Sequence, residues 1–152
     1  MVSYIYHNTK RSVILLVKII MGLKGSGKTK KLVELVREAV DLEHGDVVCI
    51  EKNKKLTYDI PYRARLIDAG EYGIGTYAFL EGFISGLHAG NYDITHIFID
   101  NFFKLVDDKS SEALDAFVTW LEAFSAREHI EFVVSVTAEI ESASEIVRAH
   151  LI

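Results

Sequence analysis

Eight residues near the amino end constrain the fold more than any other stretch of the chain. Residues 22–29 read Gly-Leu-Lys-Gly-Ser-Gly-Lys-Thr and fit the pattern G-x-x-x-x-G-K-[ST] at every fixed position. An apolar, β-branched run over 13–20 precedes them, and apolar residues at helical spacing follow at Leu32, Leu35, Val36, Ala39 and Val40. The sequence therefore predicts a strand, a glycine-rich loop and a helix, in that order.

The residues of this loop suit the binding of a polyphosphate. Glycines let backbone N–H groups approach phosphate oxygens closely while the chain turns sharply from strand to helix. Lys28 is expected to bridge the terminal phosphates, and the Thr29 hydroxyl is expected to bind Mg²⁺. We interpret the stretch as a Walker A phosphate-binding loop. The candidate nucleotide-binding residues are Gly22, Leu23, Lys24, Gly25, Ser26, Gly27, Lys28, Thr29 and Lys30.

The charges at the start of the following helix support this interpretation. Acidic side chains are normally favoured at a helix amino end, yet Lys28, Lys30 and Lys31 occupy this one. Such a cluster of lysines indicates that an anion is bound there.

Length and composition predict one compact domain. The chain has 152 residues, of which 49% are apolar, so it can bury one sizeable core. We assign residues 13–152 to that domain and residues 1–12 to an arm or an extra strand. With 17 basic and 22 acidic residues the net charge is −5, so the molecule as a whole does not attract nucleic acid or acidic membranes.

Cysteine content and hydropathy predict a cytoplasmic protein without a membrane segment. The single cysteine, Cys49, excludes an internal disulfide and a multi-cysteine zinc site, as suits a reducing compartment. The longest apolar stretch, Val13–Met21, is interrupted by Lys18. It is far shorter than the roughly 20 residues that a membrane-spanning helix needs.

Strands and helices alternate along the rest of the sequence. The patterns predict strands over 46–51, 94–100 and 131–136, a short strand over 64–68, and helices over 29–42, 76–88, 111–127 and 142–150. Parallel strands need a crossover segment, usually a helix, to carry the chain back. The predicted fold class is therefore three-layer α/β/α with a mostly parallel sheet.

Residues 52–75 carry a weaker pattern and mix basic with aromatic side chains. These are Lys52, Lys54, Lys55, Arg63 and Arg65, interleaved with Tyr58, Tyr62 and Tyr72. Such a loop could stack a nucleobase and hold a nucleic-acid backbone. The alternative is an ordinary solvated loop, so nucleic acid is neither an expected partner nor an excluded one.

An acidic residue is needed near the glycine loop if Mg²⁺ is to be held, and Asp100 is the candidate. It ends an apolar strand, so its carboxylate is expected at the carboxyl edge of the sheet, where ligands of such folds bind. There it would hold a water on the metal, the Walker B role. We predict Thr29 and Asp100 as the metal residues. The alternatives are that Asp100 caps a turn, or that Asp107 takes its place.

The sequence resembles the P-loop NTPase superfamily through residues 22–29 and Ile97–Asp100. The resemblance is to the division with an additional strand between the phosphate-loop strand and the Walker B strand, which includes the RecA-like ATPases. It covers the architecture from Val13 to about Ala138, and it implies ATP and Mg²⁺ as ligands. Family members often carry a catalytic glutamate beside the Walker B aspartate, but Asn101 stands there in this sequence.

The resemblance also implies roles for residues at the ends of two other strands. The RecA-like branch has its glutamate at the end of the second strand, where this chain has Glu51; the alternative is an ordinary exposed strand end. A polar residue ending the 131–136 strand would sense the γ-phosphate, and Thr137 or Ser135 could do this, unless they cap the turn. The candidate catalytic residues are Lys28, Glu51 and Asp100, and no arginine finger can be assigned.

Four functions remain open on the sequence alone. The first is a slow Mg²⁺-dependent ATPase or nucleotide-controlled switch, acting on a protein partner or a second copy of the chain. GTP is less favoured, because Asn53-Lys54-Lys55-Leu56 lacks the aspartate that binds a guanine ring. The second is a small-molecule kinase, because Phe98–Phe103 resembles the Walker B region of thymidine kinases. Against it, the zinc ribbon of that family cannot form with one cysteine. The others are a RecA-like motor core acting on DNA or a pilus or secretion machine, and an interaction module without turnover.

Overall fold

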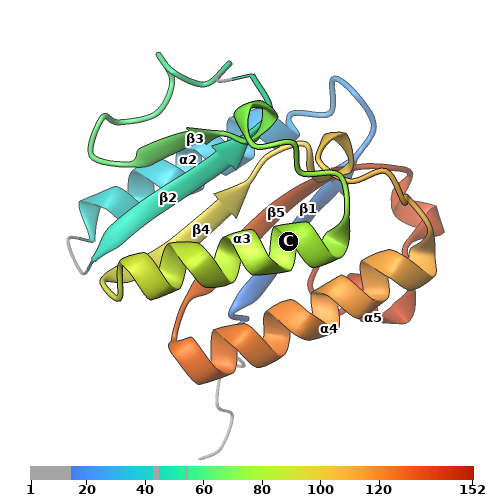
Figure 1. Cartoon of the computed structure of the whole chain (residues 1–152). Helices are drawn as coiled ribbons and strands as arrows, with labels where there is room; N and C mark the ends of the chain where they lie inside the picture. Colours follow the sequence, from blue (N-terminus) through green and yellow to red (C-terminus); the bar gives the residue numbers. More distant parts are fainter. Residues whose placement is uncertain (1–14, 43–44, 54) are drawn as a thin grey trace, which may run out of the picture.

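The computed structural model describes residues 15–42, 45–53 and 55–152, which form a parallel sheet with helices on both faces (Figure 1). The strands are β1 Val17–Gly22, β2 Asp46–Glu51, β3 Arg65–Asp68, β4 Ile94–Ile99 and β5 Glu131–Thr137. The helices are α2 Lys28–Asp41, α3 Tyr77–Gly90, α4 Ser111–Glu128 and α5 Glu145–Arg148, with 3₁₀ turns η1 Ala69–Glu71, η2 Phe102–Lys104 and η3 Ile140–Ser142. The prediction of a three-layer α/β fold in one small domain is confirmed.

The two faces of the sheet are covered by different helices. Helix α2 packs on one face, and α3 and α4 pack on the other (Figure 1). In β1, Val17, Ile19 and Met21 join the core beneath α3 and α4, whereas Ile20 joins the core beneath α2. Both faces are buried, which explains why the strands read as continuous apolar runs rather than as alternating ones.

The strand order brings the predicted site residues to one edge of the sheet. The order is β1-β5-β4-β2-β3, so β5 lies between the strand that precedes the glycine loop and the strand that precedes Asp100. This is the additional strand that the family resemblance implies. The parallel register pairs Gly22 with Thr137 and Ile99 with Val134. The carboxyl ends of β1, β5 and β4 therefore meet along the same edge.

The predicted elements agree closely with the observed ones, except at the two ends of the chain. Strand β1 begins at Val17, later than predicted, and residues 1–14, with the proposed arm over 1–12, lie outside the described residues. The predicted helix over 142–150 is wrong in extent, because only Glu145–Arg148 form a helix, capped by the Ser144 hydroxyl. The chain then runs beside β1, where Ile19 N donates to His150 O at 2.8 Å and Ile152 N donates to Ile19 O at 3.1 Å. This pairing gives hydrogen-bond partners to the backbone N–H and C=O groups of Ile19 on the edge of the sheet. Another turn of helix would have left these groups unpaired.

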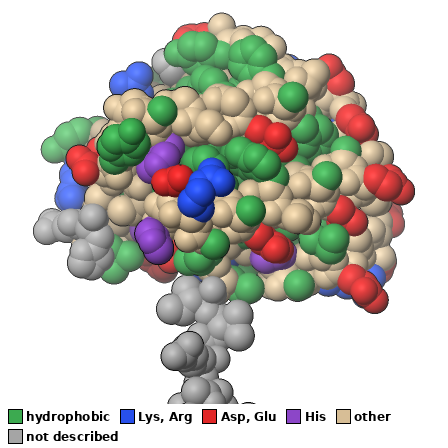
Figure 2. Space-filling model, turned by 60° about the horizontal axis from the view of Figure 1, so that its bottom comes forward, with side chains coloured by type: hydrophobic (Ala, Val, Ile, Leu, Met, Phe, Trp, Pro, Cys, Tyr) green, Lys and Arg blue, Asp and Glu red, His purple; other side chains and the backbone are tan. Residues whose placement is uncertain are grey.

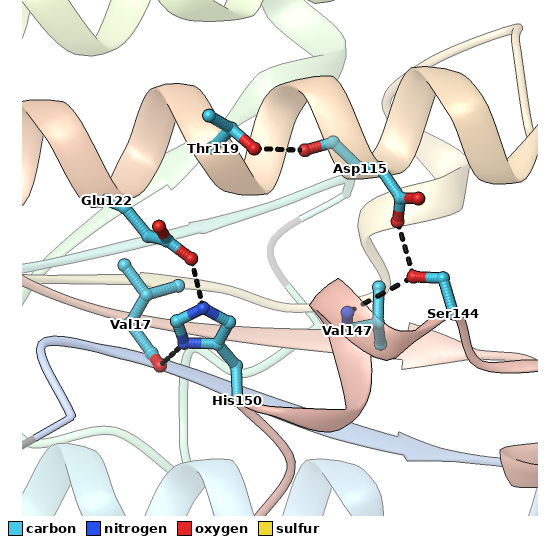
Figure 3. Close-up of polar contacts among 7 residues, drawn as sticks. All are labelled: Val17, Asp115, Thr119, Glu122, Ser144, Val147 and His150. Atoms are coloured by element: carbon cyan, nitrogen blue, oxygen red, sulfur yellow. Dashed lines mark hydrogen bonds and ion pairs between the residues drawn. The ribbon is translucent and has the colours of Figure 1, made fainter.

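Polar side chains fasten this carboxyl-terminal segment to β1 and α4 (Figure 3). His150 Nδ1 donates to Val17 O at 2.8 Å, and its Nε2 contacts the carboxylate of Glu122 on α4. Ser144 Oγ donates to Asp115 Oδ1 at 2.5 Å. The last residues are thus held by side chains as well as by backbone pairing.

An aromatic stack joins α3, α4 and the turn that follows Asp100. The Phe117 ring of α4 stacks on Phe102 with 5.0 Å between ring centroids, and the Tyr77 ring meets Phe117 edge-on at 5.6 Å. Phe102 and Phe117 are fully buried. The stack therefore fixes the segment directly after β4, on which part of the site is built.

We predict that Phe117→Ala lowers the free energy of unfolding by about 3–5 kcal/mol, because it removes a buried ring and leaves a cavity. Chemical denaturation measures the change. The matched control is Phe79→Ala on α3, whose side chain is 47% exposed and whose loss should cost about 0.5 kcal/mol or less. Equal effects of the two substitutions would contradict the assignment of Phe117 to the core.

Candidate functional site

The glycine loop between β1 and α2 has a backbone that only glycine adopts readily. Gly25 and Gly27 have φ angles of 84° and 87°, in the left-handed region that side chains disfavour. Ser26 N donates to Leu23 O at 3.1 Å, which closes the turn. A Cβ atom on Gly22 would lie 2.4 Å from Ser26 Oγ. Gly25 and Gly27 therefore hold conformations that other residues disfavour, and a side chain on Gly22 would force Ser26 to move.

This backbone is suited to hold an anion. Residues that alternate into the left-handed conformation turn their N–H groups toward a common point. The loop leads directly into α2, a helix of 14 residues whose first N–H groups have no partner within the helix. Lys28 is buried, and its Nζ donates to Leu23 O at 2.8 Å, so the ammonium group lies over the loop.

The structure brings together the two residues that the sequence predicted to bind Mg²⁺. Asp100 directly follows β4 and is 1% exposed. The Thr29 hydroxyl, from the first turn of α2, donates to Asp100 Oδ2 at 3.1 Å. Ser135 Oγ of β5 donates to Asp100 Oδ1 at 2.5 Å and accepts from Asn101 N at 2.8 Å. The carboxylate is therefore fixed in orientation by two hydroxyl groups, one from α2 and one from β5.

This donor set fits Mg²⁺. A hydroxyl that gives its proton to a carboxylate keeps its oxygen lone pairs available for a cation. Mg²⁺ prefers oxygen ligands and usually keeps waters and substrate phosphates in its shell, with one or two protein carboxylates. Among the described residues, no group of three or more His, Cys, Asp and Glu side chains could hold a metal ion. Any metal held here would therefore depend on phosphate oxygens and water.

A cavity of about 700 Å³ opens over the glycine loop. Its walls are formed by Lys24, Gly25, Gly27, Lys28, Thr29 and Lys30 from the loop and α2, and by Asn101, Phe103, Lys104, Lys109 and Thr137 from the other side. Phe103, Lys104 and Lys109 were not predicted as site residues. Phe103 and Lys104 follow the strand of Asp100 closely, and this position was a signal that could have identified them.

A second cavity of similar size is less suited to phosphate. It measures about 730 Å³ and lies between β3 and α3. Its walls carry charges of both signs, including Asp46, Arg65 and Glu71, and none of the predicted site residues. The cavity over the glycine loop is therefore the candidate nucleotide site.

Glu51 is not an ordinary exposed strand end, and that alternative is wrong. It ends β2, is 3% exposed, and its Oε1 accepts from Leu56 N at 2.6 Å. Burial raises the pKa of Glu51, the hydrogen bond from Leu56 lowers it, and the negative charge of Asp100 raises it further. The side chain does not line the cavity over the glycine loop.

The two candidates for a γ-phosphate sensor differ in their surroundings. Thr137 is exposed and lines the cavity. Ser135 is fully buried and engaged with Asp100, so its observed role is to orient that carboxylate. A sensor role stays a prediction, and the geometry favours Thr137.

The other candidates lie away from the cavity. Asp107 is exposed, its backbone N–H donates to Gly75 O at 2.8 Å, and its side chain does not line the cavity. No arginine lines it in the part of the chain that the structure describes. In the basic and aromatic loop, Tyr58 and Tyr62 are 99% and 95% exposed, as in a solvated loop. Nucleic-acid contact there stays a prediction.

The end of the sheet opposite the glycine loop carries histidine–carboxylate pairs. His88 Nε2 lies 2.8 Å from Glu128 Oε2, and His96 Nε2 lies 3.3 Å from Glu131 Oε2. Figure 2 shows histidine side chains beside carboxylates on the face that it presents. None of these histidines lines the cavity over the glycine loop.

In the described residues, no helix is both long enough and apolar enough to cross a membrane.

Comparisons with known proteins bear on the fold. No protein-family model matches the chain, and no curated protein matches its sequence. The crystal structure of the flagellar accessory protein FlaH from Methanocaldococcus jannaschii is similar, with a TM-score of 0.53 and 12% sequence identity. The match covers 88% of this chain and 65% of the FlaH chain, so this chain spans slightly less than two thirds of its neighbour's length. At this identity the likeness shows a shared α/β fold.

We predict that Glu51→Gln stabilises the protein increasingly as pH rises above about 4.3, the ordinary pKa of a glutamate. The folded-state pKa of Glu51 is raised. Its stabilising contribution is therefore fully present below the unfolded-state pKa and is lost as pH rises through the folded-state pKa. Chemical denaturation at a series of pH values measures the difference between variant and wild type. Glu34→Gln on the exposed face of α2 gives the background for removing one carboxylate. A difference that stays constant or shrinks with pH would contradict the burial of an ionised Glu51.

Proposed function

We propose that the protein binds ATP together with Mg²⁺ at the glycine loop and hydrolyses it slowly, as a nucleotide-controlled switch. The observation that carries the proposal is the hydrogen bond from Thr29 to Asp100. It joins two residues 71 positions apart in the sequence, both of which the sequence predicts as metal residues. The α/β fold shared with FlaH is consistent with the proposal.

The glycine loop would hold the triphosphate. Backbone N–H groups of residues 25–29 would donate to phosphate oxygens, and Lys28 would exchange its contact with Leu23 O for the terminal phosphates. Thr29 and Asp100 would hold Mg²⁺, which when bound neutralises charge on the β- and γ-phosphate oxygens. The positive charge of the cavity wall suits this ligand.

Slow turnover is supported by the absence of a carboxylate from the cavity wall in the described residues. Asn101 takes the place beside Asp100 and lines the cavity with a left-handed backbone, φ 48°. Its amide can orient a water by hydrogen bonding, but it cannot take up the proton of that water as a carboxylate does. Glu51 stays a candidate base, which would have to leave its contact with Leu56.

The segment from Asn101 to Lys109 and the residue Thr137 would respond to the γ-phosphate, because Asn101, Phe103, Lys104 and Lys109 of this segment line the same cavity as Thr137 and the glycine loop. A switch of this kind changes the order or position of such a segment when the γ-phosphate is lost. The partner that senses the change would be another protein or a second copy of this chain, in the cytoplasm.

The alternative function is a nucleoside-type kinase, and one assay distinguishes it from the hydrolase. ATP turnover is measured without an acceptor and again with a panel of nucleosides. ADP formation that requires a nucleoside would support the kinase, and turnover that is independent of acceptor would support the hydrolase.

We predict that Lys28→Ala abolishes the rise in melting temperature that MgATP produces, because it removes the ammonium group over the phosphate loop. Wild type should be stabilised by about 2.7 kcal/mol at a ligand concentration one hundred times Kd. The control, Lys18→Ala, removes the same charge from β1 far from the loop and should keep the shift. An unchanged shift in Lys28→Ala would count against the phosphate loop.

We predict that Asp100→Asn weakens nucleotide binding in the presence of Mg²⁺ more than binding in EDTA, because the substitution removes the carboxylate charge and preserves the side-chain shape. Titration calorimetry under the two conditions measures both affinities. An equal loss with and without Mg²⁺ would remove Asp100 from the metal site.

A further inference from the structure

The wall of the nucleotide cavity opposite the glycine loop carries two lysines that the phosphate-loop pattern does not include. Lys104 and Lys109 lie in the segment between β4 and α4, and both line the cavity of about 700 Å³. Lys24, Lys28 and Lys30 line it from the loop side. The cavity over the loop is therefore lined by lysines from two separate segments of the chain.

The backbone of Lys104 is held in place, whereas its side chain is exposed. It ends η2, where Lys104 N donates to Asn101 O and Leu105 N donates to Phe102 O, each at 2.9 Å. Phe102 on one side and Leu105 on the other are buried, and Phe102 stacks on Phe117. The backbone of Lys104 is thus anchored four residues after Asp100.

Neither lysine is neutralised by a neighbouring carboxylate. In the described residues, neither Lys104 nor Lys109 forms an ion pair, and no carboxylate lines the cavity. Like charges gathered in one cavity repel one another, so a bound anion would relieve this repulsion. These lysines therefore add to the positive charge that faces the ligand.

We propose that Lys104 is a catalytic residue for ATP hydrolysis, supplying from within the same chain the cation that other nucleotide hydrolases take from an arginine finger. This rests on the function proposed above. In the reaction, a water oxygen forms a bond to the γ-phosphorus while the bond from that phosphorus to the oxygen shared with the β-phosphate breaks. The electron pair stays on the ADP oxygen, and the water proton is released to solvent. Lys104 stabilises the negative charge on the γ-phosphoryl oxygens during this exchange.

Lys104 rather than Lys109 takes this role because of where each is anchored. Lys104 follows Asn101 by one 3₁₀ turn, next to the metal-binding Asp100. Lys109 lies in an exposed stretch before α4, whose backbone is held by the contact of Ser110 N with Asp108 Oδ1 at 2.9 Å. Both side chains are exposed, so the choice between them rests on the backbone: that of Lys104 is held by hydrogen bonds beside the buried Phe102 and Leu105.

The test compares binding with turnover in the full chain. Lys104→Met should lower the single-turnover rate of MgATP hydrolysis by about 100-fold or more, the cost of losing one oriented donor to a developing charge. Its affinity for MgADP should stay within about threefold of wild type, whereas trapping of ADP with aluminium fluoride, which imitates the transferring phosphoryl group, should be lost. Lys104→Arg, which restores a positive charge, should recover part of the rate. Lys109→Met should change affinity more than rate, and Lys18→Met is the control for removing one positive charge.

The outcomes separate the two proposals. If wild type hydrolyses ATP and Lys104→Met does so at the same rate, the role of Lys104 is overturned and the hydrolase stands. Equal losses of MgADP affinity and rate in Lys104→Met would also overturn it, because the lysine would then act in ground-state binding. A wild-type protein that binds MgATP without any turnover would overturn both the hydrolase and the role of Lys104.

Discussion

The hydrogen bond between the Thr29 hydroxyl and the Asp100 carboxylate is the contact on which the candidate site depends. It links the start of α2 to the end of β4, and the parallel register of β1, β5 and β4 brings these segments to the same edge of the sheet. β5 also supplies Ser135, which holds the other oxygen of the same carboxylate. One strand therefore both spaces the two halves of the site and orients its acidic group.

The distribution of charge in the site is unlike that of the molecule as a whole. The chain carries a net charge of −5, yet the cavity over the glycine loop is lined by lysines and by no carboxylate in the described residues. Asp100 lies buried beneath this surface, where it can act on a cation without repelling a phosphate in the cavity. The lysines of the cavity wall suit a polyanion in the cavity, and the Asp100 carboxylate beside Thr29 suits a divalent cation between the protein and that polyanion. A nucleotide complex with Mg²⁺ has both kinds of charge.

Much of this arrangement followed from local sequence patterns, because glycine spacing and apolar periodicity report backbone geometry directly. Gly25, Gly27, Thr29 and Asp100 were identified in this way, as was the sheet that brings them together. The role of Ser135 depends on which strand lies beside β4, so its contact with Asp100 is a property of the strand order. The alternative prediction that Glu51 is an exposed strand end was wrong, because its burial depends on the path of the following loop, in which Leu56 N donates to Glu51 Oε1. The predicted length of the final helix was wrong for a similar reason. The spacing of apolar residues does not reveal that β1 offers hydrogen-bond partners to the backbone of the last residues.

The attachment of residues 150–152 along β1 has a consequence for how the molecule can associate. Strand β1 lies at one end of the sheet, and this segment occupies its outer side, whereas β3 lies at the other end and pairs with β2. At the other margin of the sheet, β3 pairs with β2 alone among the described strands, and its outer side is an edge of the sheet. Growth of the sheet by strands from a neighbouring molecule would begin there, with three strands between the new strand's partner β3 and β1 with its glycine turn, and would leave the mouth of the phosphate cavity uncovered.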